Sequence, residues 1–399
     1  MPETESAPDT PTDTGTESVK FAYWVPNVSG GLVTSRIEQR TDWGYDYNRE
    51  LAVLAENNGF DYALSQVRYM ASYGAEYQHE STSFSLALLL ATQRLKVIAA
   101  VPPGLWHPGV LAKLGATADH LSKGRFAVNV VSGWFKGEFA ALGEPWLEHD
   151  ELPQFSASLE PGGAPIRRSE EFIRALRQIW TEDHAELAGD FYRLRDFSLK
   201  PKPLNTPERP HPEIFQGGNS TAARAMAGRV SDRYFSNGKD FDGVSEQIAD
   251  VHKAATEVGR KAPKFGLNAF LIARDTEAEA RDTLREIVAQ ADSEAVEGFG
   301  AAVKQAGQST ADGKGMWQDS SFEDLVQYND GFRTGLIGTP EQIAERIVAY
   351  KRLGVDLLLL GFLHHHEEVE YFGRRVLPLV RELEAQLPRS DAESVAVHA

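Results

Sequence analysis

The chain has 399 residues, of which 42% are hydrophobic and 10% aromatic, and its formal net charge at pH 7 is −17. This composition supplies a large apolar core and excludes a disordered or fibrous protein. The acidic charge, with its dispersed Lys and Arg, argues against nucleic acid or an anionic membrane as the main partner. The lack of cysteine excludes disulfides, thiolate metal sites and a Cys nucleophile, and it fits a reducing, cytoplasmic location.

From Val19 onward, short β-type runs alternate with helical patterns. The expected strands are 19–26, 62–67, 96–103, 125–133, 213–218, 234–238, 264–274 and 357–363. The expected helices include 47–60, 108–121, 167–180 and 340–355, and a terminal helix at 367–383. Several strands are apolar nearly throughout, which is typical of strands covered on both faces. The pattern predicts an α/β fold, a (β/α)8 TIM barrel, with two doubly wound domains as the main alternative.

The two ends of the chain differ from its centre. Residues 1–18 are acidic and rich in Pro and Thr, without the apolar core of a signal peptide, and predict a disordered tail. The apolar run 86–91 is too short to span a bilayer. We expect one barrel domain over 19–385 and a flexible tail over 386–399.

Three insertions interrupt the alternation of strands and helices. Residues 135–165 are rich in Gly and Pro, 185–204 predict a hairpin followed by an extended run, and 291–335 are polar and rich in Gly. Insertions after barrel strands lie at the C-terminal face, where active sites are built. Composition leaves open whether 291–335 is a mobile lid or a solvent loop without a role.

The stretch "HPEIFQGGNSTAARAMAGRV" (211–230) joins an apolar strand to an Ala-rich helix. Its strand ends at Gly217-Gly218, and its helix opens at Asn219-Ser220. Unpaired N–H groups at such a helix start can bind an anion. A tight turn with a Ser cap is the alternative reading, and the motif alone leaves both open.

Other polar residues also follow the expected strands. Asn129 lies inside the apolar strand 125–133, where its amide needs either a ligand or a neighbouring strand as its partner. The strand ends are rich in amides, hydroxyls and Trp but offer no close pair of carboxylates, which argues against a glycosidase. The candidate residues at strand ends are Trp24, Asn27, Gln66, Arg68, Ser132, Trp134, Gln216, Asn219, Asn237, Asn268 and His364.

The run "LHHHEEVE" (363–370) suggests a metal cluster at first sight. In extended structure, alternate side chains point to opposite sides, so only His364 and His366 would share one. The following carboxylates fit the acidic first turn of the last helix. We therefore expect no metal, and His364 as either a site donor or a capped structural residue. A pocket of amides and aromatics then needs a cofactor to carry the chemistry.

Three motifs are specific enough to indicate a family. "DHLSKGRFAVNVVSGW" (119–134), "FQGGNS" (215–220) and the terminal "LLLGF…EEVEYFG…VLPL" resemble the bacterial luciferase-like, flavin-dependent monooxygenases. Within that family, the blocks 21–48, 129–151 and 321–332 are similar to the branch that oxidises dimethyl sulfone. The resemblance covers about residues 19–385.

The resemblance implies a barrel that takes reduced FMN (FMNH2) from a separate NAD(P)H:flavin reductase. Oxygen would add to the flavin, and the peroxyflavin would convert dimethyl sulfone to methanesulfinate and formaldehyde, as a route to sulfur. Family members are usually homodimers or homotetramers. An alkanesulfonate-type monooxygenase, a deazaflavin-dependent oxidoreductase and a catalytically silent flavin-binding barrel remain alternatives.

The resemblance also implies site residues. The resemblance places Asn129 near the flavin ring and oxygen; the expected catalytic residues are Asn129 and, from their positions at strand ends, Trp134 and His364. The expected cofactor-binding residues are Val67, Arg68, Asn129, Ser132, Glu138, Arg167, Gly218, Asn219 and Ser220. Arg167 belongs to a position where relatives usually carry a Tyr-Arg pair, and Ile166 replaces the aromatic member here.

The substrate side is inferred from a comparison within the family. Relatives that act on alkanesulfonates carry Arg, His and Tyr where this chain has Asn268, Phe270 and Phe362. Loss of the cation favours a neutral substrate over a sulfonate anion. The expected substrate-contacting residues are Trp24, His79, Phe270, Phe362 and His364, of which Trp24, His79 and His364 are candidate donors to the sulfone oxygens.

Overall fold

The computed structural model describes residues 17–70, 72–133, 135–147, 163–308, 315 and 317–387. The expected tails therefore lie almost entirely outside the described residues, as do Trp134 and most of the unusual stretch 152–165. Among the described residues, no helix combines the length and the apolar character needed to cross a bilayer.

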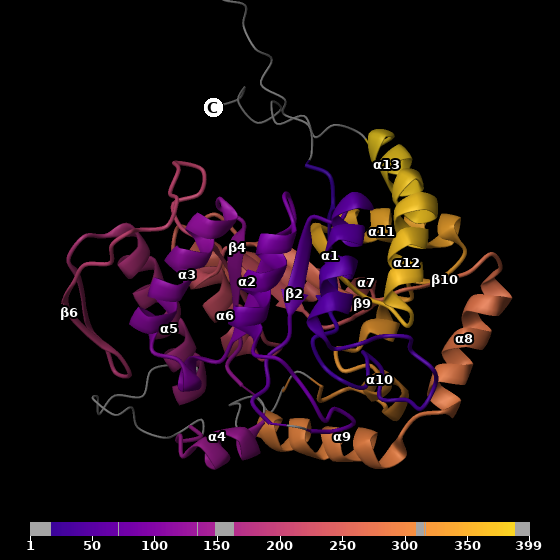
Figure 1. Ribbon diagram of the computed structural model, residues 1–399, viewed down its shortest axis with the longest axis horizontal. Coiled ribbons are helices and arrows are strands. Elements are labelled where there is room, and N and C mark those ends of the chain that lie inside the picture. Colours follow the sequence, from indigo (N-terminus) through magenta and orange to yellow (C-terminus); the bar gives the residue numbers. More distant parts are fainter. Residues whose placement is uncertain are drawn as a thin grey trace, which may run out of the picture.

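Eight parallel strands close into a barrel, which confirms the predicted fold (Figure 1). In order around the barrel they are β1 (Lys20–Val25), β12 (Val355–Gly361), β9 (Lys264–Phe270), β8 (Arg233–Ser236), β7 (Glu213–Gly217), β4 (Phe126–Val130), β3 (Lys96–Val101) and β2 (Tyr62–Ser65). Each one falls within or beside a predicted strand. The predicted run 264–274 divides, because β10 (Ile272–Ala273) leaves the barrel and pairs with β11 (Ile337–Gly338).

A ring of helices covers the outside of the barrel (Figure 1). It comprises α1 (Tyr45–Asn57), α2 (Ser81–Ala91), α3 (Pro108–Ser122), α5 (Gly163–Thr181), α6 (Thr221–Val230), α7 (Phe241–Glu257), α11 (Pro340–Leu353), α12 (His365–Tyr371) and α13 (Leu377–Ala385). The predicted terminal helix is divided by a π-helical turn, Phe372–Val376, between α12 and α13. The main apolar core fills the space between this ring and the strands.

Local sequence signals explain where these helices begin and end. In α11, Thr339 and Gln342 form a reciprocal capping box around Pro340, the first helical residue. The helix stops at Gly354, whose φ of 107° is left-handed backbone that favours glycine. The barrel interior is filled by its own apolar layer, including Leu64, Phe235 and Leu359, so only its ends can hold a ligand.

The insertions carry further structure. The predicted hairpin is confirmed as β5 (Ala185–Ala188) and β6 (Arg193–Phe197), which pair antiparallel. Helices α4 (Lys136–Leu142), α8 (Glu277–Ala289), α9 (Ser293–Gln308) and α10 (Phe322–Val326) follow strands β4 and β9. Figure 1 shows α4, α9 and α10 together at the C-terminal end of the barrel, opposite α13.

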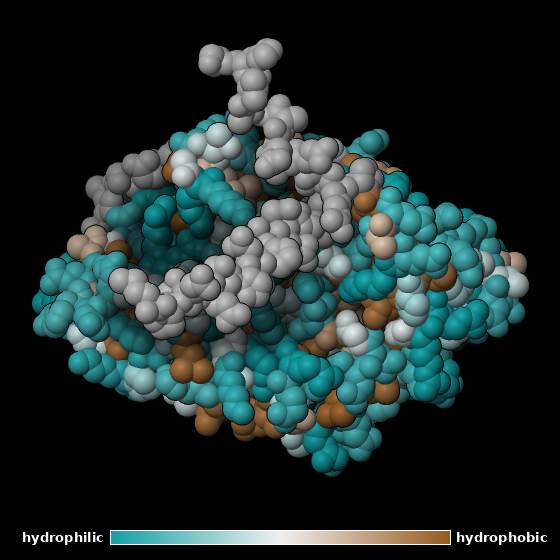
Figure 2. Space-filling model, turned by 90° about the horizontal axis from the view of Figure 1, so that it is seen from above, coloured by the Kyte–Doolittle hydropathy of each residue, from teal (hydrophilic) through white to brown (hydrophobic). Residues whose placement is uncertain are grey.

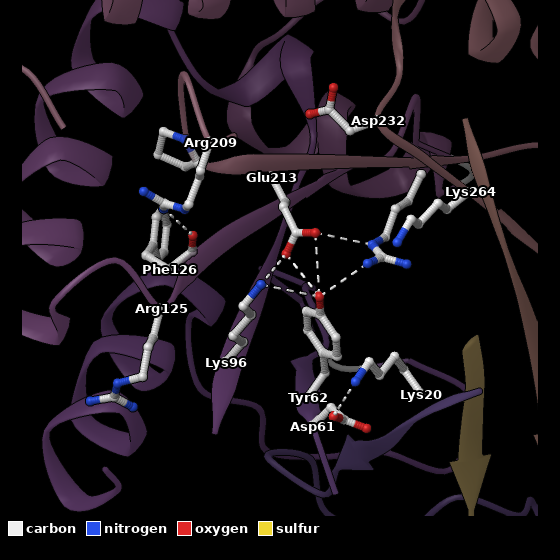
Figure 3. Close-up of polar contacts among 12 residues, drawn as sticks. Lys20, Asp61, Tyr62, Lys96, Arg125, Phe126, Arg209, Glu213, Asp232 and Lys264 are labelled. Carbon is white, nitrogen blue, oxygen red and sulfur yellow. Dashed lines mark hydrogen bonds and ion pairs between the residues drawn. The ribbon is translucent and has the colours of Figure 1, made fainter. Parts of the chain in front are cut away.

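The opposite, N-terminal face is predominantly hydrophilic (Figure 2). Below it, the first residues of β2, β3, β7 and β8 form a charged layer, part of which is shown in Figure 3. Glu213 Oε2 accepts hydrogen bonds from the Tyr62 hydroxyl at 2.9 Å and from Lys96 Nζ at 3.0 Å. Arg233 Nε donates to Glu213 Oε1 at 3.1 Å. One carboxylate therefore stabilises two cations at the closed end of the barrel.

We predict that Glu213→Gln destabilises the fold, because Lys96 and the buried Arg233 lose their shared counter-charge. The expected loss at pH 7 is about 3 kcal/mol. Burial alone would raise the pKa of Glu213, but Arg233 and Lys96 lower it to about 2. The stabilisation is therefore present above the ordinary pKa and is lost as pH falls from about 4.5 toward 2.

Thermal unfolding of wild type and variant at pH 7 and pH 3 measures this effect. The difference in Tm should be large at pH 7 and smaller at pH 3. Glu186→Gln, at an exposed carboxylate on β5, is the matched control and should change Tm little at either pH. Equal Tm values for Glu213→Gln and wild type at pH 7 would contradict the prediction.

Candidate active site

A deep pocket opens at the C-terminal ends of the strands, between the barrel and the insertions. It contains about 1650 Å³ of empty space, including its open mouth. The expected site residues that line it are Trp24, Val67, Arg68, Asn129, Ser132, Gly218, Asn219 and Ser220.

The floor of the pocket carries two amides in an apolar setting. Asn268 Oδ1 accepts a hydrogen bond from the Trp24 indole N–H at 3.0 Å, so this donor is already engaged. Asn268 Nδ2 donates to Ser236 O at 2.7 Å. Asn129 is 6% exposed, and its Oδ1 has no hydrogen-bond partner in the described part of the chain. The sequence left two possible partners for the Asn129 amide, a ligand or a neighbouring strand. No described strand donates to Oδ1, so this oxygen is available to a ligand.

The junction between β7 and α6 forms one wall. Ser220 caps α6, and its Oγ accepts from Ala223 N at 3.3 Å. Gly218 has a φ of 147°, and a Cβ at this position would lie 2.6 Å from Ala223 Cβ. Asn219 is held in place through hydrogen bonds from Gln247 and Arg224. The junction is therefore a Ser-capped turn and also a helix N-terminus that faces the pocket, where its dipole favours an anion.

The adjacent wall comes from the end of β4 and the start of α5. The hydroxyls of Ser132 and Ser169 are 2.8 Å apart and hydrogen-bonded. Ile166 and Arg168 line the pocket. Arg167, the residue expected there, forms an ion pair with Asp190 at the tip of the β5–β6 hairpin. Sequence reasoning missed Arg168, because two adjacent arginines at a helix start give no signal of which one faces inward.

The loop after β2 contributes Val67 and Arg68. The Arg68 guanidinium donates to Ser72 Oγ and lies 5.3 Å from the centre of the Tyr328 ring. Glu138, on α4, does not line the pocket and instead accepts a hydrogen bond from Tyr69 N. Burial raises the pKa of Glu138, against the effect of these backbone donors and Arg68. Glu138 therefore holds the loop that carries Arg68 and does not itself face the pocket.

The insertion 291–335 covers the pocket with helices and aromatic rings. Phe299 packs edge-on against Trp317 and Tyr328, with ring centres 5.4 Å and 5.0 Å apart. All three line the pocket. Of the two alternatives for this insertion, its position over the pocket favours the cover. Its helix α9 was not predicted, although the spacing of Val296, Phe299 and Val303 is a helical signal that could have indicated it.

A buried carboxylate ties the end of this cover to the barrel. Asp330 is 2% exposed, and its side chain accepts from Ser320 Oγ at 2.7 Å and from Asn237 Nδ2 at 3.4 Å. Burial, with repulsion from Asp324, raises the pKa of Asp330 to about 7. Gly238 N also donates to Asn329 O at 2.8 Å. The attachment of residues 320–330 to the barrel therefore depends on the charge state of Asp330.

Four of the expected substrate and catalytic residues lie outside the pocket lining. The His79 ring packs between Trp43 and Phe84, with ring centres 4.9 Å away on each side. Phe270 and Phe362 are fully buried in apolar clusters. His364 is half-buried, and its backbone N–H donates to Glu368 at 3.2 Å.

The histidine run differs from its expected conformation. His365 and His366 begin helix α12, so the alternation expected for an extended strand is wrong. His365 is fully buried, which lowers its pKa to about 3, and His366 stacks on Tyr47 at 4.4 Å. Glu367 and Glu368 do form the acidic first turn. Within the described ranges, no three His, Cys, Asp or Glu residues are grouped to hold a metal ion.

Together, the fold and the pocket define a TIM-barrel protein whose site suits an aromatic, anionic ligand. The model of the family described as luciferase-like monooxygenase matches residues 19–357. The chain belongs to this family.

Close relatives agree with this assignment, and a solved structure shares the fold. The FMNH2-dependent dimethylsulfone monooxygenase of Pseudomonas putida is 63% identical over 370 residues, which are 93% of this chain and 97% of the relative. The protein of the same name from Pseudomonas fluorescens (strain Pf0-1) is 61% identical over 95% of this chain and 99% of its own. The crystal structure of a riboflavin lyase has the same fold, with a TM-score of 0.75 at 20% identity over 94% of both chains.

We predict that wild type loses folding stability as pH rises through about 7, and that Asp330→Asn does not show this loss. Because the folded pKa of Asp330 lies above the ordinary value of 3.8, its stabilising contribution is complete below that value and is lost as pH rises through about 7. Between pH 5 and pH 8 the loss amounts to about 2–3 kcal/mol. The Tm of the variant minus that of wild type should therefore increase by a few degrees over this range.

Differential scanning calorimetry at pH 5 and pH 8 provides the measurement. The control is Asp319→Asn at a neighbouring exposed acid, for which the Tm difference should stay constant. A constant difference for Asp330→Asn as well would show that the buried carboxylate has no such role.

Proposed function

We propose that this chain is an FMNH2-dependent monooxygenase that oxidises dimethyl sulfone to methanesulfinate and formaldehyde. The observation that carries the proposal is the near-full-length identity, above 60%, to two relatives of that name. In the balanced reaction, dimethyl sulfone, O2 and FMNH2 give methanesulfinic acid, formaldehyde, water and FMN. A separate NAD(P)H-dependent reductase supplies the reduced flavin.

The residues of the pocket fit FMN. The unpartnered Asn129 Oδ1 suits an N–H donor of the flavin ring, and the N-terminus of α6 suits the phosphate. The apolar floor and the aromatic cover suit a planar ring system. When bound, reduced FMN supplies the two electrons with which one atom of O2 enters the product and the other becomes water.

This chain's own residues then bind, orient and exclude water. Asn129 orients the flavin ring, Val67 and Arg68 border it, and Ser132 with Gly218, Asn219 and Ser220 surrounds the phosphate. Phe299, Trp317 and Tyr328 exclude water from the reacting centre, which limits wasteful formation of peroxide. Glu138 acts through the loop that carries Arg68.

The substrate side favours a neutral molecule. Asn268 and Trp24 face the pocket with their polar groups bonded to each other, so this wall presents no free charge. An alkanesulfonate is the second candidate, because the Arg68 guanidinium also lines the pocket and can attract an anion. Competition between the two substrates decides between them.

The assembly is proposed to be a homodimer or homotetramer. Leu90 on α2 and Val110 and Leu121 on α3 are each more than half exposed, and a second copy of the chain would cover them. The lack of cysteine is compatible with action in the reducing cytoplasm.

The proposed reaction is tested by product analysis. Purified protein, a flavin reductase, FMN, NADH and dimethyl sulfone are incubated in air, and methanesulfinate and formaldehyde are measured by mass spectrometry. Parallel reactions contain methanesulfonate, or a reduced deazaflavin in place of FMN. Oxygen consumption no higher than that of the reductase alone, without either product, would reject the proposal.

We predict that Asn129→Ala lowers kcat/KM for dimethyl sulfone about 10- to 100-fold, because one hydrogen bond to the reacting ring system is lost. More of the consumed NADH should then appear as hydrogen peroxide. Initial rates of product formation and peroxide release measure both effects. Asn205→Ala, at an exposed amide remote from the pocket, is the control. Wild-type coupling in Asn129→Ala would show that Asn129 does not contact the flavin.

A further inference from the structure

One cation in the pocket has no ion-pair contact with a carboxylate in the described part of the chain, although Glu144 acts on it at longer range. Arg168 is 8% exposed and lines the pocket, yet it has no hydrogen bond or ion pair to any described residue. Its Nε is buried without a partner. The guanidinium lies 5.7 Å from the centre of the Phe139 ring. A Cβ at Gly104 would approach Arg168 Nη2 to 2.6 Å, so the side chain is closely confined.

A buried, unpaired guanidinium is costly to the folded protein. Two neighbouring arginines do have carboxylate partners. Arg167 is paired with Asp190, and Arg224, on α6, is paired with Glu246 and Asp250. The lack of such a contact at Arg168 therefore indicates an anion that the described residues do not provide.

The position of Arg168 within the barrel identifies where this anion would lie. Strands β4 and β7 are neighbours, with Val130 paired to Gln216. Beyond the ends of these strands, Ser132 and Gly218 both line the pocket. Ser132 is hydrogen-bonded to Ser169, the residue after Arg168. Arg168 and the N-terminus of α6 thus belong to the same side of the pocket.

We propose that Arg168 is a cofactor-binding residue that binds the phosphate of FMN together with Ser132 and the N-terminus of α6. This inference rests on the proposed function and deepens it, because it assigns the charge that selects a phosphorylated flavin. Ile166, on the same turn of α5, offers the phosphate no polar group. In a chain of net charge −17, one buried guanidinium provides a local attraction that the overall field does not.

Comparison of two flavins tests this role without using catalysis. Affinities for FMN and for riboflavin, which lacks the phosphate, are measured by fluorescence titration of the apoprotein. Wild type should prefer FMN. Arg168→Met should reduce this preference about 10- to 100-fold while riboflavin affinity changes less than about twofold. Arg168→Lys should restore part of the preference.

The matched control is Arg174→Gln, at an exposed arginine further along α5, and it should keep the wild-type preference. Arg167→Gln tests the adjacent arginine. A loss of preference in Arg167→Gln but not in Arg168→Met would overturn the inference, as would an equal loss of both flavins in Arg168→Met. Wild-type protein that binds neither flavin would instead reject the proposed function.

Stability of the apoprotein supplies an independent readout. If Arg168 binds a ligand and has no structural role, its replacement by Met removes a buried charge that lacks an ion-pair contact. The Tm of the variant without flavin should then be equal to that of wild type or about 1–3 °C higher. Inorganic phosphate should raise the Tm of wild type and should not raise that of the variant. A lower Tm for Arg168→Met, with the same response to phosphate as wild type, would show a purely structural role.

Discussion

Closure of eight parallel strands into a barrel is the constraint on which the rest of this structure depends. Because every strand runs the same way, all eight carboxyl ends meet at one rim. The interior between the rims is filled by apolar side chains such as Leu64, Phe235 and Leu359. A ligand can therefore enter only at an end, and the residues and insertions that follow the strands are brought together there, however distant they are in the sequence.

The two rims of the barrel carry their buried charges in different surroundings. At the N-terminal rim, Glu213 is shared between Lys96 and Arg233, and this compensation suits a structural role. At the C-terminal rim, Asn129 Oδ1 and Arg168 Nε are buried without partners among the described residues. Both residues line the same pocket, where a ligand can supply the missing partners, and this favours a binding role for them.

Much of the fold could be predicted from the sequence, because periodicity and caps are local signals. The apolar runs located all eight barrel strands, and the Gly189-Asp190 turn located the β5–β6 hairpin. Residues 291–335 were left open between a lid and a solvent loop, and the helices α9 and α10 within them were not predicted, since the polar composition hides a helix whose apolar face packs on distant rings. The conformation predicted for the histidine run was wrong because α12 begins at His365, two residues before the predicted terminal helix at 367–383.

The sequence by itself determined the barrel, the rim that bears the site, and the strand-end residues Asn129, Ser132 and Gly218 to Ser220. Its motifs also determined the family, because they extend over nearly the whole chain. Only the tertiary structure decided that Arg168 rather than Arg167 lines the pocket, and that Phe270 and Phe362 are core residues. The direction of a side chain at the start of a helix depends on packing against β4, α4 and the β5–β6 hairpin, and no local pattern records those distant contacts.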